Sequence, residues 1–171
     1  MNIPAIDRLL PHSTPMVLLD RLESWAPESA RASVTLRRGM RFLDGDTMGS
    51  LFLIEHMAQT IAASLGYEAY LEGKGVRQGM LVGCREYDAH VEGVKVGDTL
   101  DIEASRLSHA DAMSRFGCRV TRDGELVAEA SVTLFHPPSG SLPSVSPRAT
   151  VCASIVGFRR YFGPEDRSIV T

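Results

Sequence analysis

The stretch that decides the fold is GSLFLIEHMAQTIAASLG, residues 49–66. It is rich in residues that favour helices, is apolar on nearly all faces, and reaches a glycine at its end. These features predict a helix of roughly 27 Å or more that is surrounded by protein and ends at Gly66 or shortly after it. Because Glu55, His56 and Gln59 interrupt the apolar run, we expect no membrane span here.

Strand-like runs lie on both sides of this predicted helix. Two come before it and four after it, over residues 16–25, 30–36, 80–91, 99–108, 112–121 and 126–136. The dipeptide Asp123-Gly124 separates the last two and is a hairpin signal, because both residues tolerate positive φ. A single helix among consecutive hairpins predicts an α+β fold, with an antiparallel sheet of about five to six strands wrapped round one long central helix.

The chain divides into two parts at the proline pair Pro137-Pro138. Its 171 residues fit one domain, which we place at 1–138. Residues 139–171 begin with a Pro/Ser-rich run and carry only scattered apolar residues, so we expect a linker and a poorly ordered tail. At the other end, Ile3 to Pro11 has the spacing of one or two helical turns.

Composition excludes several classes of function. Lys and Arg total 18 against 21 Asp and Glu, which leaves no basic surplus for nucleic acid. The N-terminus lacks the charged start and long apolar run of a signal peptide, so we expect a cytoplasmic protein. Cys84, Cys118 and Cys152 form no CxxC pair and are expected to be buried as small hydrophobic residues. No nucleotide or metal motif is present, and we expect neither a metal nor a cofactor.

Four short motifs carry a resemblance to a known family. They are LPHSTPMVLLDR (residues 10–21), IEHMAQ (54–59), VGDTL (96–100) and DGELVAEA (123–130). In their order and spacing they resemble the 3-hydroxyacyl-thioester dehydratases of bacterial fatty-acid synthesis. The pattern is most similar to a divergent branch of these dehydratases that is associated with aryl-polyene pigment gene clusters.

This resemblance implies a hot-dog fold whose subunits pair, with active sites in the interface. In the family, a catalytic His of one subunit faces a Glu or Asp on the central helix of the other, and the resemblance maps that acid onto Glu55. The family's His-Phe-Pro segment corresponds here to Arg41-Phe42-Leu43, so Arg41 stands where the His is expected. The resemblance also implies that Glu55 lies at the mouth of an acyl tunnel.

Removing water from a 3-hydroxyacyl thioester requires a base for the C2 proton and an acid for the departing hydroxyl. Glu55 fits the acid, because an apolar helix would desolvate its carboxyl; the alternative is a structural Glu bonded to a loop. Gln59 lies one turn further on the same face and could orient Glu55, a loop or substrate, or be purely structural. His56 points about 100° away from Glu55 and is expected to serve packing or an interface.

His12 is the candidate for the missing base, because it lies in a Pro-bracketed loop and imidazole titrates near neutrality. The competing interpretation is a His that anchors the loop by bonding to backbone. Gly49 and Ser50 open the predicted helix, where free backbone amides could hold a thioester oxygen. Their alternative is an ordinary helix cap, for which Ser50 is suited.

The leading hypothesis is therefore a dehydratase that acts on an acyl carrier protein or coenzyme A thioester, with Glu55 as acid and His12 as base. A second hypothesis, prompted by Arg41, is a catalytically weak partner or acyl-binding subunit that pairs with an active dehydratase. A third is a hot-dog acyl thioesterase. In each case we expect a homodimer or a heterodimer with a related subunit, because an isolated sheet leaves a strand edge exposed.

Overall fold

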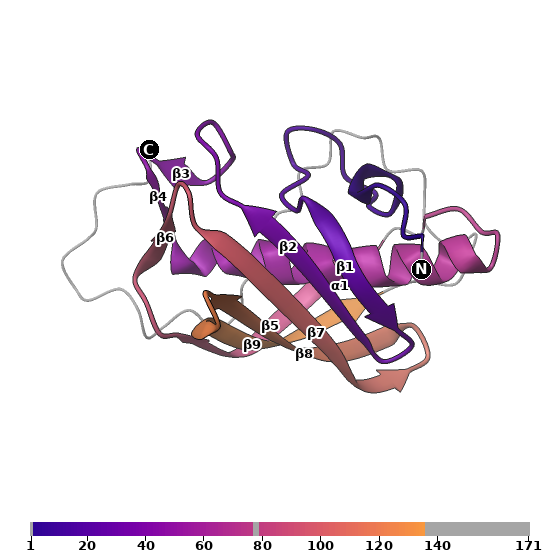
Figure 1. The fold of residues 1–171 in the computed structure, drawn as a ribbon. Helices are drawn as coiled ribbons and strands as arrows, with labels where there is room; N and C mark the ends of the chain where they lie inside the picture. The colour runs from indigo at the N-terminus through magenta and orange to yellow at the C-terminus, as the bar shows by residue number, and fades with distance from the viewer. Residues whose placement is uncertain (1, 77–78, 136–171) are drawn as a thin grey trace, which may run out of the picture.

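The computed structural model describes residues 2–76 and 79–135, in which a curved sheet encloses one long helix (Figure 1). The helical elements are η1 (Ile6–Arg8), η2 (Ser50–Phe52) and α1 (Leu53–Leu71). The strands are β1 (Arg21–Ala26), β2 (Ser29–Thr35), β3 (Leu43–Asp44), β4 (Thr47–Gly49), β5 (Met80–Ala89), β6 (Gly93–Lys95), β7 (Thr99–Ala110), β8 (Met113–Arg122) and β9 (Glu125–Phe135).

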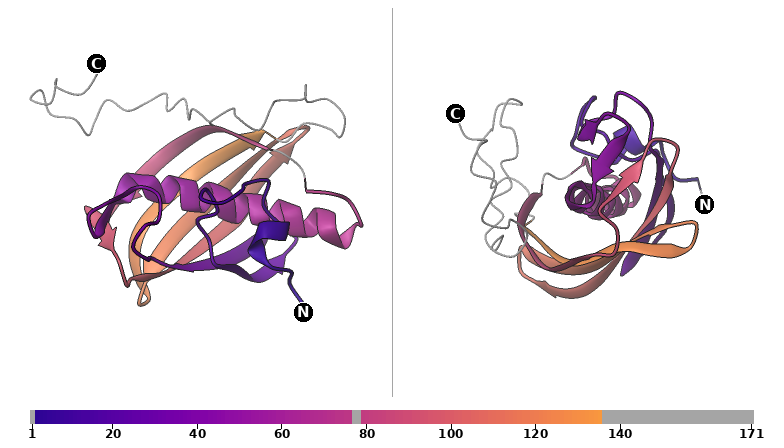
Figure 2. Two further views of the ribbon diagram at one scale, coloured as in Figure 1. Left: turned by 90° about the horizontal axis from the view of Figure 1, so that it is seen from above. Right: turned by 90° about the vertical axis from the view of Figure 1, so that its left-hand side faces the viewer.

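The main sheet has six strands in the order β1-β2-β7-β8-β9-β5, and every neighbouring pair is antiparallel. Seen along the helix axis, the sheet curls round α1 and covers it on one side (Figure 2). The predicted α+β architecture, two strands, a helix and then four strands in one wrapped sheet, is confirmed. The edges are β1 and β5.

The predicted central helix is confirmed, with its ends displaced toward the C-terminus. It opens with the short turn η2, and α1 continues beyond Gly66 to Leu71. Gly66 therefore does not end the helix. Its role is close packing, because a Cβ placed there would come within 2.0 Å of the Leu9 carbonyl oxygen. Glycine allows the chain after η1 to cross directly over the helix backbone.

The core lies between the helix and the inner face of the sheet. Strand β8 shows the alternation, with Phe116, Cys118 and Val120 buried and the residues between them facing outward. Cys118 is buried, as predicted, whereas Cys84 is half-buried. Burial raises the pKa of the Cys118 thiol to about 12 and that of the Cys84 thiol to about 11. Cys152 lies outside the described residues.

The Asp123-Gly124 turn is confirmed as a tight hairpin, because both residues have positive φ, 53° and 81°. A second, three-stranded sheet with the order β3-β4-β6 was not predicted. Its strands have two or three residues each, which is too short to show a hydrophobic period. It lies at the N-terminal end of the central helix (Figure 1).

Two of the sequence predictions concern residues beyond Phe135. The domain boundary at residue 138 and the poorly ordered tail both fall outside the described residues. Within the described ranges, none of the helices has the length and apolarity needed to cross a bilayer.

Candidate active site

Glu55 is the third residue of α1 and the acidic residue of its first turn. Its side chain is half-buried, with 26% of its surface exposed. The carboxyl is therefore less enclosed than an apolar helix led us to expect. It faces the segment that precedes β1, which supplies the other groups of the site.

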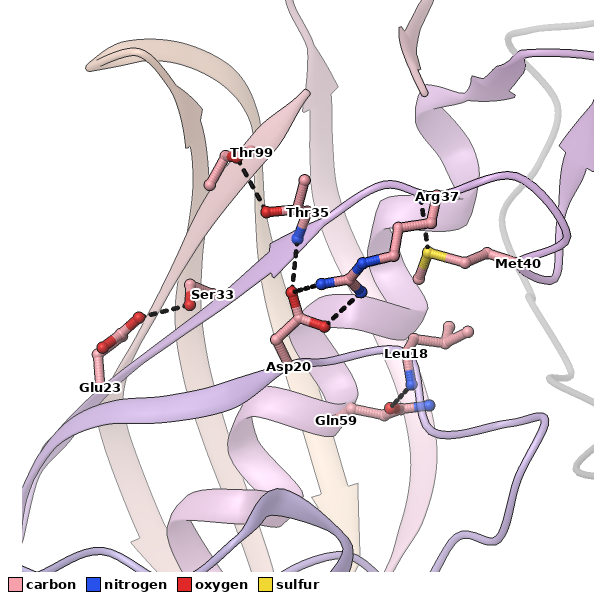
Figure 3. Close-up of polar contacts among 9 residues, drawn as sticks. All are labelled: Leu18, Asp20, Glu23, Ser33, Thr35, Arg37, Met40, Gln59 and Thr99. Atoms are coloured by element: carbon pink, nitrogen blue, oxygen red, sulfur yellow. Dashed lines mark hydrogen bonds and ion pairs between the residues drawn. The ribbon is translucent and has the colours of Figure 1, made fainter. Parts of the chain in front are cut away.

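Gln59 joins the helix to that segment and is completely buried. Its Oε1 accepts a hydrogen bond from the Leu18 backbone N–H at 2.9 Å (Figure 3). Its Nε2 donates to the Met16 carbonyl at 2.7 Å and to Glu55 Oε1 at 3.0 Å. Gln59 thus orients both the carboxyl and the loop, two of the alternatives that the sequence left open.

These bonds also explain an error in the predicted strand. The sequence placed residues 16–25 in one strand, but β1 begins only at Arg21. The Met16 carbonyl and the Leu18 N–H instead form hydrogen bonds with the Gln59 amide. A helix side chain has replaced a neighbouring strand as the hydrogen-bonding partner of this segment, which keeps it on the helix beside Glu55.

His12 is brought to Glu55 by the same segment. Its Nε2 lies 3.8 Å from Glu55 Oε1, close enough for an ion pair with protonated His but too far for a hydrogen bond. The side chain exposes 24% of its surface, whereas Nδ1 is buried and has no hydrogen-bond partner among the described residues. The expected alternative, a His bonded to backbone to anchor the loop, is therefore not what the structure shows.

Asp20 anchors the far end of this segment. Its carboxylate receives two hydrogen bonds from the Arg37 guanidinium, at 2.7 and 2.8 Å, and one from the Thr35 backbone N–H at 2.9 Å (Figure 3). Burial alone would raise the pKa of Asp20, but these bonds outweigh it and lower the pKa. In the sequence Asp20 is part of a motif, but no local pattern connects it with Arg37, its partner in the ion pair.

Gly49 and Ser50 lie where the sequence put them, at the start of the central helix. Gly49 ends β4 opposite Gly93, and the Ser50 N–H donates to the Glu92 carbonyl at 3.0 Å. The Ser50 amide is therefore already used, and the expectation that it is free to hold a thioester oxygen is wrong for this chain. The N-cap of α1 is Phe52, and no side chain caps either turn, so Ser50 is not the cap either.

His56 is fully buried, in agreement with the packing interpretation. Its Nδ1 lies 3.2 Å from the Phe52 carbonyl, and because a carbonyl only accepts, this nitrogen carries the proton. Burial lowers the pKa of His56 to about 4, so the ring is neutral near pH 7. It lies one position from Glu55 and points to another side of the helix.

Arg41 is exposed and forms no ion pair within the described residues. The residue after it, Phe42, has a positive φ of 69°, and its ring stacks on Phe52 with centroids 4.8 Å apart. This aromatic pair holds the Arg41 loop against the start of α1. The stack offsets the cost of the left-handed backbone at a bulky residue.

Two further features concern ligands. A hollow of about 380 Å³ is lined by β5, β7, β8 and β9, but neither Glu55 nor His12 lines it. It is therefore not the acyl tunnel that the resemblance implies beside Glu55. Across residues 2–76 and 79–135, no group of three or more His, Cys, Asp or Glu side chains is arranged to hold a metal ion.

Comparison with known proteins assigns the chain to a family. Residues 4–144 match the ApeP-like family, described as ApeP dehydratase. The 3-hydroxyacyl-(acyl-carrier-protein) dehydratase FabZ of Granulibacter bethesdensis is 31% identical over 148 residues, which is 77% of this chain and 79% of that protein. FabZ of Polynucleobacter asymbioticus is also 31% identical, over 78% of this chain and 91% of the relative.

Solved structures agree with these relatives. A chain of the dehydratase heterocomplex ApeI:P from Xenorhabdus doucetiae superposes with a TM-score of 0.76 at 26% identity, covering 81% of this chain and 94% of that one. A hypothetical thioesterase with coenzyme A from Streptococcus pneumoniae gives a TM-score of 0.54 at 12% identity, over 68% and 84% of the two chains, and shows the shared fold alone. The chain belongs to the ApeP-like dehydratase family, within the hot-dog proteins related to FabZ.

Proposed function

We propose that this protein removes water from 3-hydroxyacyl thioesters to form trans-2-enoyl thioesters, and that Glu55 and His12 are the acid and base. The observation that carries the proposal is the contact between these two side chains. One comes from the helix and the other from the loop, with 3.8 Å between Glu55 Oε1 and His12 Nε2. Family membership supplies the reaction class, and this contact supplies the groups that exchange protons.

Gln59 restricts where the acid can carry its proton. Because Gln59 Oε1 already accepts from Leu18, its Nε2 must be the atom that donates to Glu55 Oε1. An oxygen that accepts this bond is not the one that carries the acidic proton. The proton for the departing hydroxyl is therefore held on Glu55 Oε2.

The proposed reaction balances with these two groups. His12 takes the C2 proton, the C3–O bond breaks, and Glu55 protonates the departing hydroxyl to give water, which leaves a double bond between C2 and C3. The proton on His12 then returns to Glu55 across the short gap between them. No cofactor takes part in this scheme.

The direct test is the variant Glu55→Gln, which keeps the shape of the side chain and removes the proton it gives. We expect the conversion of 3-hydroxyacyl to enoyl thioester to fall by at least about 100-fold, the usual contribution of a general acid. Glu72→Gln, at the other end of the helix, is the matched control and should retain full turnover. Unchanged turnover in Glu55→Gln removes this residue from the mechanism.

A second candidate function is a partner subunit that shapes the tunnel of an active dehydratase. Two observations favour it: Arg41 stands where the family's catalytic His is expected, and the structural relative from Xenorhabdus doucetiae is a heterocomplex. This alternative predicts that the purified chain is inactive and that turnover appears only on mixing with a related hot-dog dehydratase. Under the first proposal the chain turns over substrate alone.

We propose further that the chain works as a dimer, with itself or with a related subunit, joined along β5. This edge strand exposes Met80 and Val82 to 51% and 49%. An open edge flanked by apolar side chains favours pairing with a second sheet. A monomer in sedimentation at micromolar concentration would contradict this.

The thioester carrier is proposed from the family as an acyl carrier protein, with coenzyme A as the alternative. Comparing turnover of one 3-hydroxyacyl chain on the two carriers decides between them. The same assay covers the thioesterase alternative, because hydrolysis releases free thiol and no enoyl product. The fold similarity to a hypothetical thioesterase carries no argument for that activity.

A further inference from the structure

The outer face of the main sheet carries the hollow of about 380 Å³ that the proposed reaction does not use. Its floor is a row of small residues on three adjacent strands, since Ser105 pairs with Gly117 and Gly117 pairs with Ser131. Because Phe116 and Cys118 point into the core, Gly117 faces away from it. This hollow, called here the outer trough, therefore lies on the side of the sheet opposite α1.

The walls of the outer trough are mainly acidic. Its charged lining residues are Glu86, Asp88, Glu103, Glu129 and Arg119. Arg119 lies 3.9 Å from Glu129 and so offsets only one of the four carboxylates. The other three acids are exposed and form no ion pair within residues 2–76 and 79–135.

One wall is apolar. Leu107 is 55% exposed. Its side chain lies over the floor, because a Cβ built on Gly117 would come within 3.5 Å of it. The trough thus combines an apolar contact with unpaired negative charge. A segment that combines aromatic rings with positively charged side chains would match both features.

A second copy of this face does not fit that description. Two outer troughs brought together would place their carboxylates against one another, and like charges in a buried interface cost free energy. An acidic carrier would be repelled for the same reason. The occupant must therefore bring positive charge.

The chain itself contains such a segment. Residues 158–162 read Phe-Arg-Arg-Tyr-Phe, with both arginines enclosed by aromatic residues. Residues 136–171 hold four arginines against two acids; they are Arg148, Arg159, Arg160, Arg167, Glu165 and Asp166. This part of the chain is more basic than the protein as a whole, whose net charge is -3.

The chain between β9 and residues 158–162 is long enough for this segment to reach the outer trough, and it starts beside the trough. Strand β9 contributes Ser131 to the trough floor and ends four residues later at Phe135. Residues 136–157 could extend over roughly 70 Å, far more than the width of a few strands at about 4.8 Å each. A segment tethered beside its site has a high effective concentration there, so weak contacts suffice.

We propose that the outer trough binds residues 158–162 of the same chain, with Arg159 and Arg160 paired to its carboxylates and the aromatic rings on Leu107 and the small-residue floor. The outer face of the sheet is then an intramolecular docking surface. This inference does not depend on the proposed reaction, because none of these residues belongs to the candidate active site.

The test is the rate at which a bulky maleimide labels the variant Ser105→Cys, whose thiol lies on the trough floor. The background is the full chain with Cys152→Ser; Cys84 and Cys118 react slowly, because burial raises their thiol pKa values to about 11 and about 12. Adding Arg159→Glu and Arg160→Glu should accelerate labelling about tenfold, as the docked segment is released. Glu125→Cys, at the exposed β8–β9 turn, should label at the same rate in both chains.

Two further variants test whether charge pairing is the cause. Arg148→Glu with Arg167→Glu changes the charge of the segment equally but lies outside the aromatic run, and should leave labelling slow. Adding Asp88→Arg and Glu103→Arg to the Arg159→Glu and Arg160→Glu chain should restore the slow rate. Equal labelling in all chains would overturn the proposal. Labelling could also become slower as the protein concentration rises and stay slow after Arg159→Glu and Arg160→Glu. That result would show that a second copy of the chain covers this face, and it would also overturn the proposal.

Discussion

At the scale of single residues, Gln59 holds the candidate site together. It uses its carbonyl oxygen on Leu18 and its amide protons on Met16 and Glu55, so a buried polar side chain is satisfied by three partners. A helix that carried only an acid at this place would leave the loop and the carboxyl free to move. The position of His12 relative to Glu55 depends on this amide.

We therefore expect Gln59→Leu to lower stability as well as activity. The substitution keeps a side chain of similar length but leaves the Leu18 N–H and the Met16 carbonyl without partners. The free energy of unfolding should fall by about 2–4 kcal/mol, the cost of two unsatisfied backbone groups. Urea denaturation measures this, and Gln78→Leu, a glutamine remote in the sequence from the motif, is the control. A loss of activity without any loss of stability would contradict the structural part of this role.

His56 gives a second prediction at this scale, in the dependence of stability on pH. Its pKa is about 4 in the folded protein against 6.5 for an unperturbed histidine, so the unfolded chain binds the proton first. Its contribution is fully present above about pH 6.5 and is lost as the pH falls toward 4, by up to about 3 kcal/mol. Thermal unfolding from pH 7 to 4 should show this loss, and His56→Leu should reduce it. A loss of equal size in His56→Leu would contradict the assignment, with exposed His90→Leu as the control.

At the scale of elements, the sequence predicts the helices and strands that follow a local pattern. It does not predict features that depend on a contact between residues distant in the sequence. The central helix, the hairpins and the Asp123-Gly124 turn follow from local patterns and were found. Strands β3, β4 and β6 are too short for any pattern. Residues 16–20 have the composition of a strand, but Met16 and Leu18 form hydrogen bonds with the Gln59 side chain instead. Glu55 and Gln59 could be proposed from helical spacing and the family motif, whereas the 3.8 Å contact with His12 required the folded chain.

The crossing of η1 over the helix is the element contact that we expect to be least tolerant of change. A methyl group at Gly66 would meet the Leu9 carbonyl oxygen at 2.0 Å, and this obstacle is backbone. Gly66→Ala should therefore lower the free energy of unfolding by at least about 2 kcal/mol, although alanine is the better helix former. Gly75→Ala, where nothing lies within 4 Å of the added carbon, is the matched control. A stabilised Gly66→Ala protein would show that this crossing is not as close as described.

At the scale of the whole molecule, the two faces of the sheet serve different purposes. The inner face encloses the helix that carries Glu55, and the β5 edge is proposed for subunit pairing. The outer face carries an acidic trough for which the chain has a basic, aromatic segment of its own. Loss of docking on the outer face would leave the chemistry at Glu55 unchanged, so the two proposals fail separately.

The most direct test of the central claim is isotope exchange during the reverse reaction. The protein is incubated with a trans-2-enoyl thioester in water enriched in deuterium and ¹⁸O, and the 3-hydroxyacyl product is analysed by mass spectrometry. If Glu55 and His12 move protons as proposed, the native chain incorporates deuterium at C2 and ¹⁸O at C3, and Glu55→Gln incorporates neither. Equal incorporation by Glu55→Gln and the native chain would contradict the account.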